Sequence, residues 1–372
     1  MTEQTAPEQE ILTEVAGGVG LITLNRPKAM NALSHGMVVA IREQLEAWAE
    51  DADVRAVVVR GAGERGLCAG GDVKTLHGMI TQGRAAEAMG YFHDEYRMNH
   101  AIAAYPKPYV AFMDGFVLGG GVGVSAHGSH RVVTERTKVG MPETGIGFTP
   151  DVGGSWLLAR APHRLGRHLG LTSEFASGAD AVALGFADVL VSSEDLDALV
   201  ADLRAALREA DSAGAEAAVD AVLARHAREP GEAALIEAAA WLESAYDHDT
   251  VEEILAELER VAGEHEDAQV REHAGTIVET LRAKSPTSVK VTLEALRRLE
   301  GMEDGDVRDA LRQEYRLASH MLRRHDMAEG IRAQLVDKDR NPQWDPATVE
   351  EVGDDVVQAH FDTPADGELA LG

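Results

Sequence analysis

The chain has 372 residues, of which 45% are apolar and 26% charged, a composition that is typical of a globular enzyme and excludes a disordered chain. Its formal charge of −28 argues against nucleic acid and anionic membranes as partners, because a phosphate-rich surface would meet a repulsive field. The sequence has one cysteine, no apolar signal segment at its start and no apolar run long enough to span a bilayer, so it predicts a cytoplasmic protein that does not enter a membrane.

Short β-type segments alternate with helix-type segments in the first half of the chain. Strands are predicted at residues 19–24, 54–59 and 109–113, with a shorter one at 131–133. A helix is predicted after Ser34, which can cap it, because apolar residues then recur at spacings of three and four. The strands are too apolar to have one face in water. The sequence therefore predicts an α/β core over residues 10–195, with strands covered on both faces.

The composition changes near residue 195, where Ala, Glu, Arg and Leu become dominant. This pattern predicts a helical region over residues 196–361 that has solvated charged faces and packs on the core. Within it, Ser285 and Pro286 predict the start of a helix, as an N-cap followed by proline at the first helical position. Residues 1–9 and 362–372 are predicted to be flexible tails.

Two glycine-bearing segments follow predicted strands, at the point where a helix is about to begin. They are residues 68–72 and 115–123. Turns of this kind leave N–H groups unpaired, and two such groups can converge on one oxygen atom and stabilise an oxyanion. The glycines are also compatible with tight turns or close helix packing alone. Neither segment has the glycine spacing of a dinucleotide fingerprint or the Gly-Lys-Ser/Thr ending of a P-loop.

Two carboxylates, Glu143 and Asp151, lie in a loop rich in glycine and proline at residues 141–154. A carboxyl group among apolar neighbours such as Ile146 and Phe148 has a raised pKa, which suits proton transfer near neutral pH. A structural interpretation is open as well, in which Glu143 is a turn acceptor and Asp151 caps a glycine-rich turn.

The order of these motifs resembles the enoyl-CoA hydratase/isomerase, or crotonase, superfamily. Segments 25–33, 69–72 and 119–121 carry the resemblance, which covers about residues 10–190. It implies a crotonase-like spiral of ββα units with an α-helical C-terminal region, an acyl-CoA substrate, and assembly into trimers or pairs of trimers. It also implies that the amides of Gly71 and Gly120 hold the thioester carbonyl. The CoA-binding positions that it implies are Lys28, Ala29, Ala69, Gly70 and Asp72.

Departures at the site indicate a branch of the superfamily. Hydratases carry one catalytic glutamate just after the glycine run and another twenty residues later, but here the first position is Gly123 and the second is Glu143. In addition, Asp151 lies in a Phe-Thr-Pro-Asp-Val-Gly-Gly context that resembles the 3-hydroxyisobutyryl-CoA hydrolases. Residues 285–288 and the ending at 336–344 also resemble that branch, whereas residues 200–280 are the least similar part.

The hydrolase resemblance implies hydrolysis of a short 3-hydroxyacyl-CoA, with 3-hydroxyisobutyryl-CoA of valine breakdown as the first expectation. Glu143 would either attack the acyl carbon or activate a water molecule, and Asp151 would accept a hydrogen bond from the 3-hydroxyl group. No cofactor is expected beyond the CoA of the substrate. Two alternatives remain open: hydration or isomerisation of an enoyl-CoA on the same scaffold, and a CoA-binding protein without catalytic activity.

Several other side chains have both a functional and a structural interpretation. Glu95 corresponds to a family position that borders the acyl pocket, or it belongs to a solvated helix face. His127 and His130 suggest a metal pair or a base, but structural histidines are more common and no third ligand has a metal-like spacing. Cys68 is interpreted as a buried packing residue and not as a nucleophile. Lysines that could pair with CoA phosphates are Lys28, Lys74 and Lys338.

Overall fold

The computed structural model describes residues 9–365 and 367–371, so that nearly all of the predicted tail 1–9 lies outside the described residues. The strands are β1 (Ile11–Ala16), β2 (Val19–Leu24), β3 (Ala56–Gly61), β4 (Tyr109–Met113), β5 (Phe116–Leu118), β6 (His130–Thr134), β7 (Lys138–Gly140), β8 (Ala176–Ser177) and β9 (Val189–Val191). The helices are α1 (His35–Glu50), α2 (Val73–Thr81), α3 (Ala85–Ala103), α4 (Gly120–Gly123), α5 (Gly154–Arg160), α6 (Leu165–Thr172), α7 (Gly178–Ala183), α8 (Leu196–Glu209), α9 (Ala215–His226), α10 (Ala234–Glu237), α11 (Ala239–Tyr246), α12 (Val251–Glu264), α13 (Ala268–Arg282), α14 (Pro286–Glu300), α15 (Val307–Met321), α16 (His325–Ile331) and α17 (Asp354–Ala359). Within the described part of the chain, no helix has both the length and the apolar character that crossing a membrane requires.

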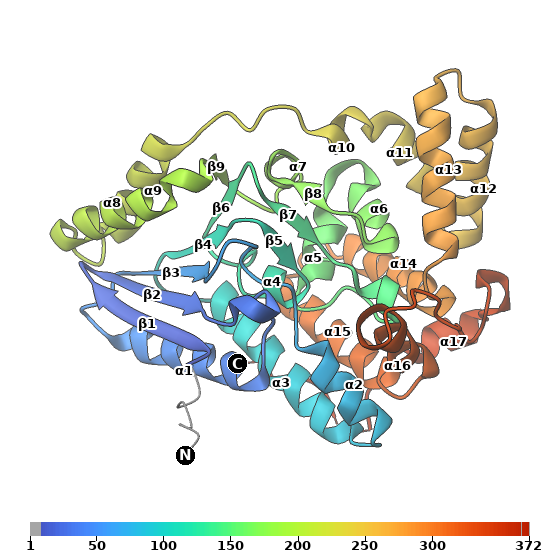
Figure 1. Ribbon diagram of the computed structural model, residues 1–372, viewed down its shortest axis with the longest axis horizontal. Coiled ribbons are helices and arrows are strands. Elements are labelled where there is room, and N and C mark those ends of the chain that lie inside the picture. The colour runs from blue at the N-terminus through green and yellow to red at the C-terminus, as the bar shows by residue number, and fades with distance from the viewer. Residues whose placement is uncertain (1–8, 366, 372) are drawn as a thin grey trace, which may run out of the picture.

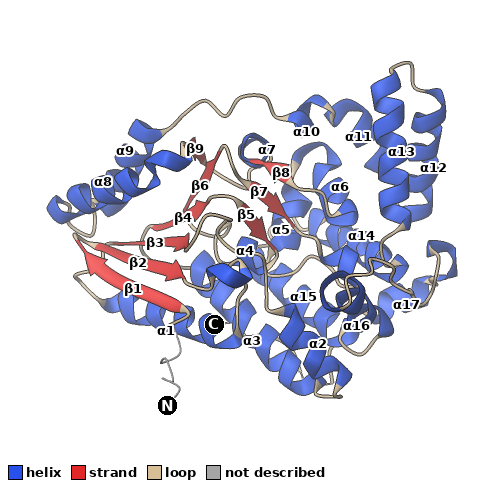
Figure 2. Cartoon of the chain, in the orientation of Figure 1, coloured by secondary structure: helices blue, strands red, loops and turns tan. Residues whose placement is uncertain are grey.

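The strands form two sheets. The larger has six strands in the order β1-β2-β3-β4-β6-β9, and the smaller has three in the order β5-β7-β8. In the larger sheet all neighbours are parallel except β1 and β2. Parallel neighbours need crossover connections, and α1 and then α2 with α3 supply the first two (Figure 2). The carboxyl ends of β3 and β4 therefore lie side by side, and one glycine segment follows each of them.

Both faces of the larger sheet are buried, which confirms the prediction from its apolar strands. Alternate residues of β3 enter two hydrophobic clusters: Val57 and Val59 pack with α1 and α3, whereas Ala56 and Val58 pack with α8 and α9. Figure 1 shows α1 and α3 on one side of the sheet and α8 and α9 on the other. A strand with no polar face needs such double coverage.

Most of the predicted elements are present with small shifts in their bounds. Strand β2 has the predicted residues, and the strand predicted at 54–59 is β3. Ser34 caps α1 by accepting a hydrogen bond from the amide of Met37 at 3.1 Å, and Ser285 caps α14 by accepting one from Ser288 at 3.2 Å. The sequence does not predict the smaller sheet, because its strands have only two or three residues and show no alternation.

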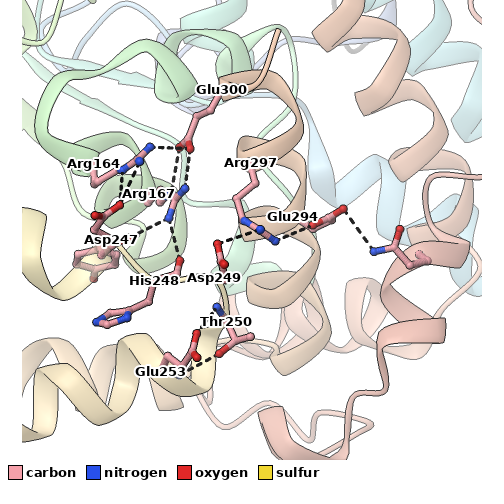
Figure 3. A network of polar contacts seen from close by, with 12 residues as sticks. Arg164, Arg167, Asp247, His248, Asp249, Thr250, Glu253, Glu294, Arg297 and Glu300 are labelled. Atoms are coloured by element: carbon pink, nitrogen blue, oxygen red, sulfur yellow. Dashed lines mark hydrogen bonds and ion pairs between the residues drawn. The ribbon is translucent and has the colours of Figure 1, made fainter.

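Helix α14 is fixed at both ends. Near its C-terminal end, Glu300 accepts hydrogen bonds from Arg167 of α6 at 2.9 and 2.6 Å (Figure 3). Arg167 is buried and also donates to two carbonyl oxygens at the end of α11 and just after it. Beside the N-terminal end, the amide of Ser285 donates to the carbonyl of Thr144 at 3.3 Å. The helical region after residue 195 thus reaches the loop that carries both predicted carboxylates.

Within the tail predicted to be flexible at 362–372, residues of the described stretch 367–371 contact the rest of the protein. Leu369 is only 2% exposed and belongs to the main hydrophobic cluster. Arg316 of α15 forms an ion pair with Glu368 at 2.9 Å. The sequence shows a short polar ending rich in proline, glycine and aspartate, but it does not show that the body offers a partner for Leu369.

Candidate active site

A cavity of about 510 Å³ lies between the two glycine segments, helix α3 and the 141–154 loop. Segments 69–71 and 118–120 form one side of it, and Tyr91, Phe92 and Glu95 of α3 contribute to the inner part. Glu143 and Asp151 line it from the 141–154 loop. The C-terminal helical region completes the wall with Lys284, Met327, Gln334 and Leu335.

The two glycine segments meet because their first residues form a β-type contact. The amide of Leu118 donates to the carbonyl of Cys68 at 3.0 Å, and the amide of Cys68 donates to the carbonyl of Phe116 at 3.1 Å. The contact places Gly70 against Gly120: a Cβ atom added to Gly120 would lie 3.3 Å from the carbonyl carbon of Gly70. Gly70 has a φ of +103°, a conformation that residues with a side chain rarely adopt. Glycine is therefore required at position 70 for its backbone conformation and at position 120 for lack of space.

Gly71 and Gly120 both line the cavity. Within the described residues, neither amide donates a hydrogen bond to a backbone oxygen or to a side chain. For Gly120 this follows from its place at the start of α4, where the first N–H groups of a helix have no intrahelical acceptor. Two free donors on adjacent turns are able to bind one oxygen atom that develops negative charge.

Glu143 begins the short 3-10 helix Glu143–Ile146, which follows strand β7. Its side chain faces the second glycine segment, because Oε1 lies 2.6 Å from the point that a Cβ on Gly119 would occupy. Oε2 is buried and has no hydrogen-bond partner within residues 9–365 and 367–371. Burial raises the pKa of Glu143 to about 8, and the charges of Glu314 and Glu95 act in the same direction. A carboxyl group in this state is suited to exchange a proton near neutral pH.

Asp151 lies further along the same loop and is 6% exposed. The hydroxyl of Tyr96 donates a hydrogen bond to Oδ2 at 2.9 Å. Burial raises the pKa of Asp151 well above its ordinary value, and the charges of Glu143, Glu95 and Glu314 raise it further. Glu314 also accepts a hydrogen bond from the amide of Gly153 at 2.7 Å, which holds the turn that follows Asp151.

Glu95 is the third carboxyl group of the cavity. It is 2% exposed, so the interpretation as part of a solvated helix face is wrong. The hydroxyl of Tyr91 donates to its Oε1 at 3.0 Å, and a Cβ on Gly120 would lie 2.8 Å from the same oxygen. Burial raises the pKa of Glu95 to about 8. The cavity thus brings Glu95, Glu143 and Asp151 together in one poorly solvated space.

These carboxyl groups make stability depend on pH. Because their pKa values are raised in the folded state, which for Glu143 and Glu95 means about 8, the folded protein holds protons that the unfolded chain has lost. The contribution of these groups to the free energy of unfolding is then fully present below about pH 4, their ordinary pKa, and it is lost as the pH rises toward 8. We expect Glu143→Gln to raise the free energy of unfolding by about 2 kcal/mol at pH 8.5 and by little at pH 5.

Thermal unfolding of both proteins at the two pH values measures this difference. Glu266→Gln is the matched control, because Glu266 is an exposed glutamate on the connection between α12 and α13. An equal shift at pH 5 and pH 8.5 in Glu143→Gln would contradict the raised pKa.

The structure does not bring all predicted binding residues into the cavity. Ala69 and Gly70 line it, but Asp72 instead caps α2 and forms an ion pair with Arg26 at 3.0 Å. Lys28 and Ala29 are exposed and are not among the residues of the cavity wall. The same is true of Lys74 and Lys338.

The remaining candidates have structural roles. His127 donates from Nε2 to the carbonyl of Val152 at 2.7 Å, and His130 is hydrogen-bonded to Asp220 at 3.1 Å. Cys68 is buried, and burial raises the pKa of its thiol to about 12, which keeps it protonated. In the described ranges, no group of three His, Cys, Asp or Glu side chains is placed to hold a metal ion.

The space beside Gly123 is filled. A Cβ added to Gly123 would lie 2.6 Å from Nδ2 of Asn99 and 2.8 Å from Cβ of Val152. Asn99 is fully buried, and neither polar atom of its side chain has a partner in the described part of the protein. A larger residue at position 123 must therefore displace Asn99.

Sequence reasoning missed four side chains that shape this site. They are Tyr96, Asn99, Lys284 and Glu314. Tyr96 and Asn99 are spaced to lie beside Glu95 on the inner face of α3, which is a signal that a helical projection of residues 85–103 contains. Lys284 and Glu314 have no such local signal, because each meets the 141–154 loop only through the tertiary fold.

Known proteins resemble this chain over nearly its whole length. The model of the enoyl-CoA hydratase/isomerase family matches residues 19–361. A protein of Gallus gallus named 3-hydroxyisobutyryl-CoA hydrolase, mitochondrial, is 38% identical over 375 residues, which cover 99% of this chain and 93% of that protein.

Two crystal structures are similar in fold as well. The one described as a carnitinyl-CoA dehydratase from Mycobacterium thermoresistibile has 48% sequence identity and a TM-score of 0.87, and the match covers 97% of this chain and 98% of that chain. The one described as an enoyl-CoA hydratase from Rhodobacter sphaeroides 2.4.1 has 37% identity and a TM-score of 0.86, with 97% and 100% covered. The names of these relatives thus describe more than one reaction.

Proposed function

Given that this chain belongs to the enoyl-CoA hydratase/isomerase family, we propose that it hydrolyses the thioester of a short 3-hydroxyacyl-CoA, above all 3-hydroxyisobutyryl-CoA, to the free acid and CoA. The observation that carries this proposal is the arrangement in one cavity of two free amides, at Gly71 and Gly120, and the unpartnered carboxyl oxygen of Glu143. The name of the Gallus gallus relative supports the same reaction.

The first step is binding of the thioester carbonyl by the amides of Gly71 and Gly120. These donors belong to the backbone and need no reorganisation when the oxygen gains negative charge. Each donor of this kind contributes roughly 3 kcal/mol to lowering the barrier. The acyl carbon is then open to attack from the side of Glu143.

Glu143 acts on the acyl carbon by one of two routes. In the first, its carboxylate oxygen bonds to that carbon, the carbon–sulfur bond breaks, CoA leaves as the thiolate, and water cleaves the resulting anhydride. In the second, Glu143 takes a proton from a water molecule that attacks directly, and the thiolate again leaves. Thiolate is a good leaving group, so a carboxylate or a water molecule is a sufficient nucleophile in either route.

Asp151 selects the acyl chain in this proposal. Because Tyr96 occupies its Oδ2, its other oxygen, which receives no hydrogen bond from a described residue, is available to the 3-hydroxyl group of the substrate. An acyl chain without that hydroxyl would leave a buried carboxyl oxygen without a partner, which costs about 1–3 kcal/mol. The cavity therefore favours 3-hydroxyacyl chains over plain ones.

A hydration or dehydration reaction is the second candidate, because the two crystal structures bear those names. The usual pair of catalytic glutamates is incomplete in this chain, since Gly123 has no side chain and Asn99 fills the adjacent space. We expect Gly123→Glu to lower the free energy of unfolding by about 3 kcal/mol and to produce no hydratase. Denaturant unfolding and the ultraviolet absorbance of an enoyl-CoA measure the two effects.

Gly275→Glu is the control for that substitution, because a Cβ at Gly275 of α13 meets nothing within 4 Å. This variant should keep nearly the stability of the original protein. A Gly123→Glu protein that is stable and consumes an enoyl-CoA would show that the site accepts a second glutamate, and it would favour the hydratase reading.

Release of free thiol tests the proposed function directly. The assay compares 3-hydroxyisobutyryl-CoA with isobutyryl-CoA and an enoyl-CoA, and the enoyl chromophore is followed in parallel. Thiol release that is fastest with the hydroxylated substrate is the expected result. Loss of the chromophore without thiol release would identify a hydratase instead, and no reaction over a broad panel would identify a CoA-binding protein without activity.

The proposal extends to the conditions under which the enzyme works. It needs no cofactor beyond the CoA of the substrate, so dialysis against a chelator should leave the rate unchanged. We place its activity in the cytoplasm, which agrees with the single cysteine of the chain, whereas the name of the Gallus gallus protein places that relative in mitochondria. It assembles as a trimer or a pair of trimers, as the superfamily resemblance implies, and light scattering measures that state.

A further inference from the structure

Lys284 is the one basic side chain among the described residues that line the cavity. It belongs to the connection between α13 and α14, directly before the cap residue Ser285. Ser173 and Phe175 also line the cavity, and Phe175 is 44% exposed. Lys284 is itself partly exposed, so it lies on a part of the cavity wall that solvent reaches.

The backbone around Lys284 is held in place. The amide of Ser285 donates to the carbonyl of Thr144 at 3.3 Å, and the indole of Trp344 donates to the carbonyl of Ala283 at 3.1 Å. The ammonium group lies against the turn that carries Glu143, since Nζ is 3.5 Å from the position of a Cβ on Gly145. The side chain is thus directed to the cavity by contacts on both sides of it.

The ammonium group of Lys284 has no hydrogen bond or ion pair with the described residues, although it is only partly exposed. Other partly exposed lysines have partners: Lys107 donates to three carbonyl oxygens, and Lys290 pairs with Glu252 at 2.7 Å. The acidic neighbour of Lys284 is Glu174, whose carboxylate is bound to His168 at 2.8 Å. Burial lowers the pKa of Lys284 to about 8, and the charge of Glu174 only partly opposes this effect. A cation in this state gains from an anionic ligand.

We propose that Lys284 binds a phosphate group of the CoA moiety as it emerges from the cavity. The proposal rests on the proposed function, since it assumes an acyl-CoA ligand. Phosphate is favoured over a carboxylate on the acyl chain, because the part of the cavity lined by Glu95, Glu143 and Asp151 offers such a carboxylate no positive charge. A protein with a formal charge of −28 needs a local cation to hold a ligand with several negative charges.

Calorimetric binding of CoA, dephospho-CoA and pantetheine to the whole protein tests the proposal. Lys284→Met keeps the length of the side chain and removes its charge, and we expect it to weaken CoA binding about tenfold. Lys284→Arg should keep the affinity within about threefold. Pantetheine, which has no phosphate, should bind both variants like the original protein.

Dephospho-CoA assigns the contact within CoA. If Lys284→Met weakens dephospho-CoA as much as CoA, the partner is the diphosphate, and if only CoA is affected, it is the 3′-phosphate; both results support the proposal. Arg225→Met on α9, which removes an exposed positive charge, is the control for net charge and should bind CoA normally.

Two results would overturn the inference. One is unchanged CoA affinity in Lys284→Met. The other is an equal loss of affinity for CoA and for pantetheine, which would mean that Lys284 contacts the pantetheine part of CoA or supports the fold. Binding of CoA does not require hydrolysis, so the two proposals fail separately. An original protein that binds CoA and releases no thiol from any substrate would reject the proposed function alone.

Discussion

Glu143→Gln is expected to lower kcat for thioester hydrolysis by about 1000-fold or more, while CoA binding stays within a factor of about two. In either route of the reaction, Glu143 must provide a carboxylate oxygen that bonds to the acyl carbon or accepts a proton. The amide of glutamine has nearly the same size but does neither at a useful rate. The amides of Gly71 and Gly120 and the cavity wall remain, so the ligand should still bind.

Thiol release under saturating substrate measures kcat, and calorimetry measures CoA binding in the same preparation. Glu266→Gln, on the surface, should have full activity. Near-normal hydrolysis by Glu143→Gln would show that this carboxylate is not the reacting group and would remove the basis of the proposed function. A single turnover of substrate by the original enzyme in ¹⁸O-water distinguishes the two routes. Label in the carboxyl group of Glu143 would identify direct attack by Glu143.

Much of the architecture could be predicted from the sequence, because it depends on local signals. The apolar runs of β3 and β4 indicated buried parallel strands, and both glycine segments follow such strands. Parallel neighbours place their carboxyl ends together, which brings the two glycine segments to the same edge of the sheet, and the contact between Cys68 and Phe116 then sets Gly70 against Gly120. The family match over residues 19–361 and the two full-length structural relatives confirm the predicted superfamily and its fold.

The rest of the site depends on contacts between distant parts of the chain. Whether Glu143 faces Gly119 or the solvent is decided by tertiary packing, and so is the burial of Glu95 on an amphipathic helix. Glu314 belongs to α15 and Lys284 to the connection between α13 and α14, and the local sequence of both is ordinary for a polar surface. Position 72 shows the opposite error, since a residue inside a family motif is engaged as a helix cap.

Buried polar groups in and beside the cavity lower the free energy of unfolding, and the proposed function accounts for the carboxyl groups among them. Three carboxyl groups share a space in which burial raises the pKa of each of them. Asn99 adds two buried polar atoms without a partner in the described structure. Each such feature destabilises the folded protein by about 1–3 kcal/mol, so neutral or smaller residues would stabilise it. In the proposed function, the acyl group of the substrate would supply the missing partner at Glu143 and at Asp151.

Asp151→Ala is expected to remove most of the preference for hydroxylated acyl chains. For 3-hydroxyisobutyryl-CoA, kcat/KM should fall about 100-fold, because the hydrogen bond from the 3-hydroxyl to a carboxyl group is lost, whereas the value for isobutyryl-CoA should change by less than about threefold. The contrast between the two substrates is the readout, and thiol release measures both. Hydrolysis of isobutyryl-CoA needs Glu143 and both amides but not the contact with the 3-hydroxyl group. Its rate therefore also shows whether the variant is folded.

Tyr96→Phe separates the role of Asp151 from a general disturbance of the loop. It removes the hydroxyl that donates to Oδ2 of Asp151 at 2.9 Å and keeps the buried ring. The carboxyl group should then lose its fixed orientation, and the preference for the hydroxylated substrate should fall by a smaller factor than in Asp151→Ala, about tenfold. A loss of the same size for both substrates in the two variants would mean that Asp151 supports the fold of the site and does not read the 3-hydroxyl group. The acyl preference would then have to come from the shape of the apolar wall formed by Phe92 and Phe148.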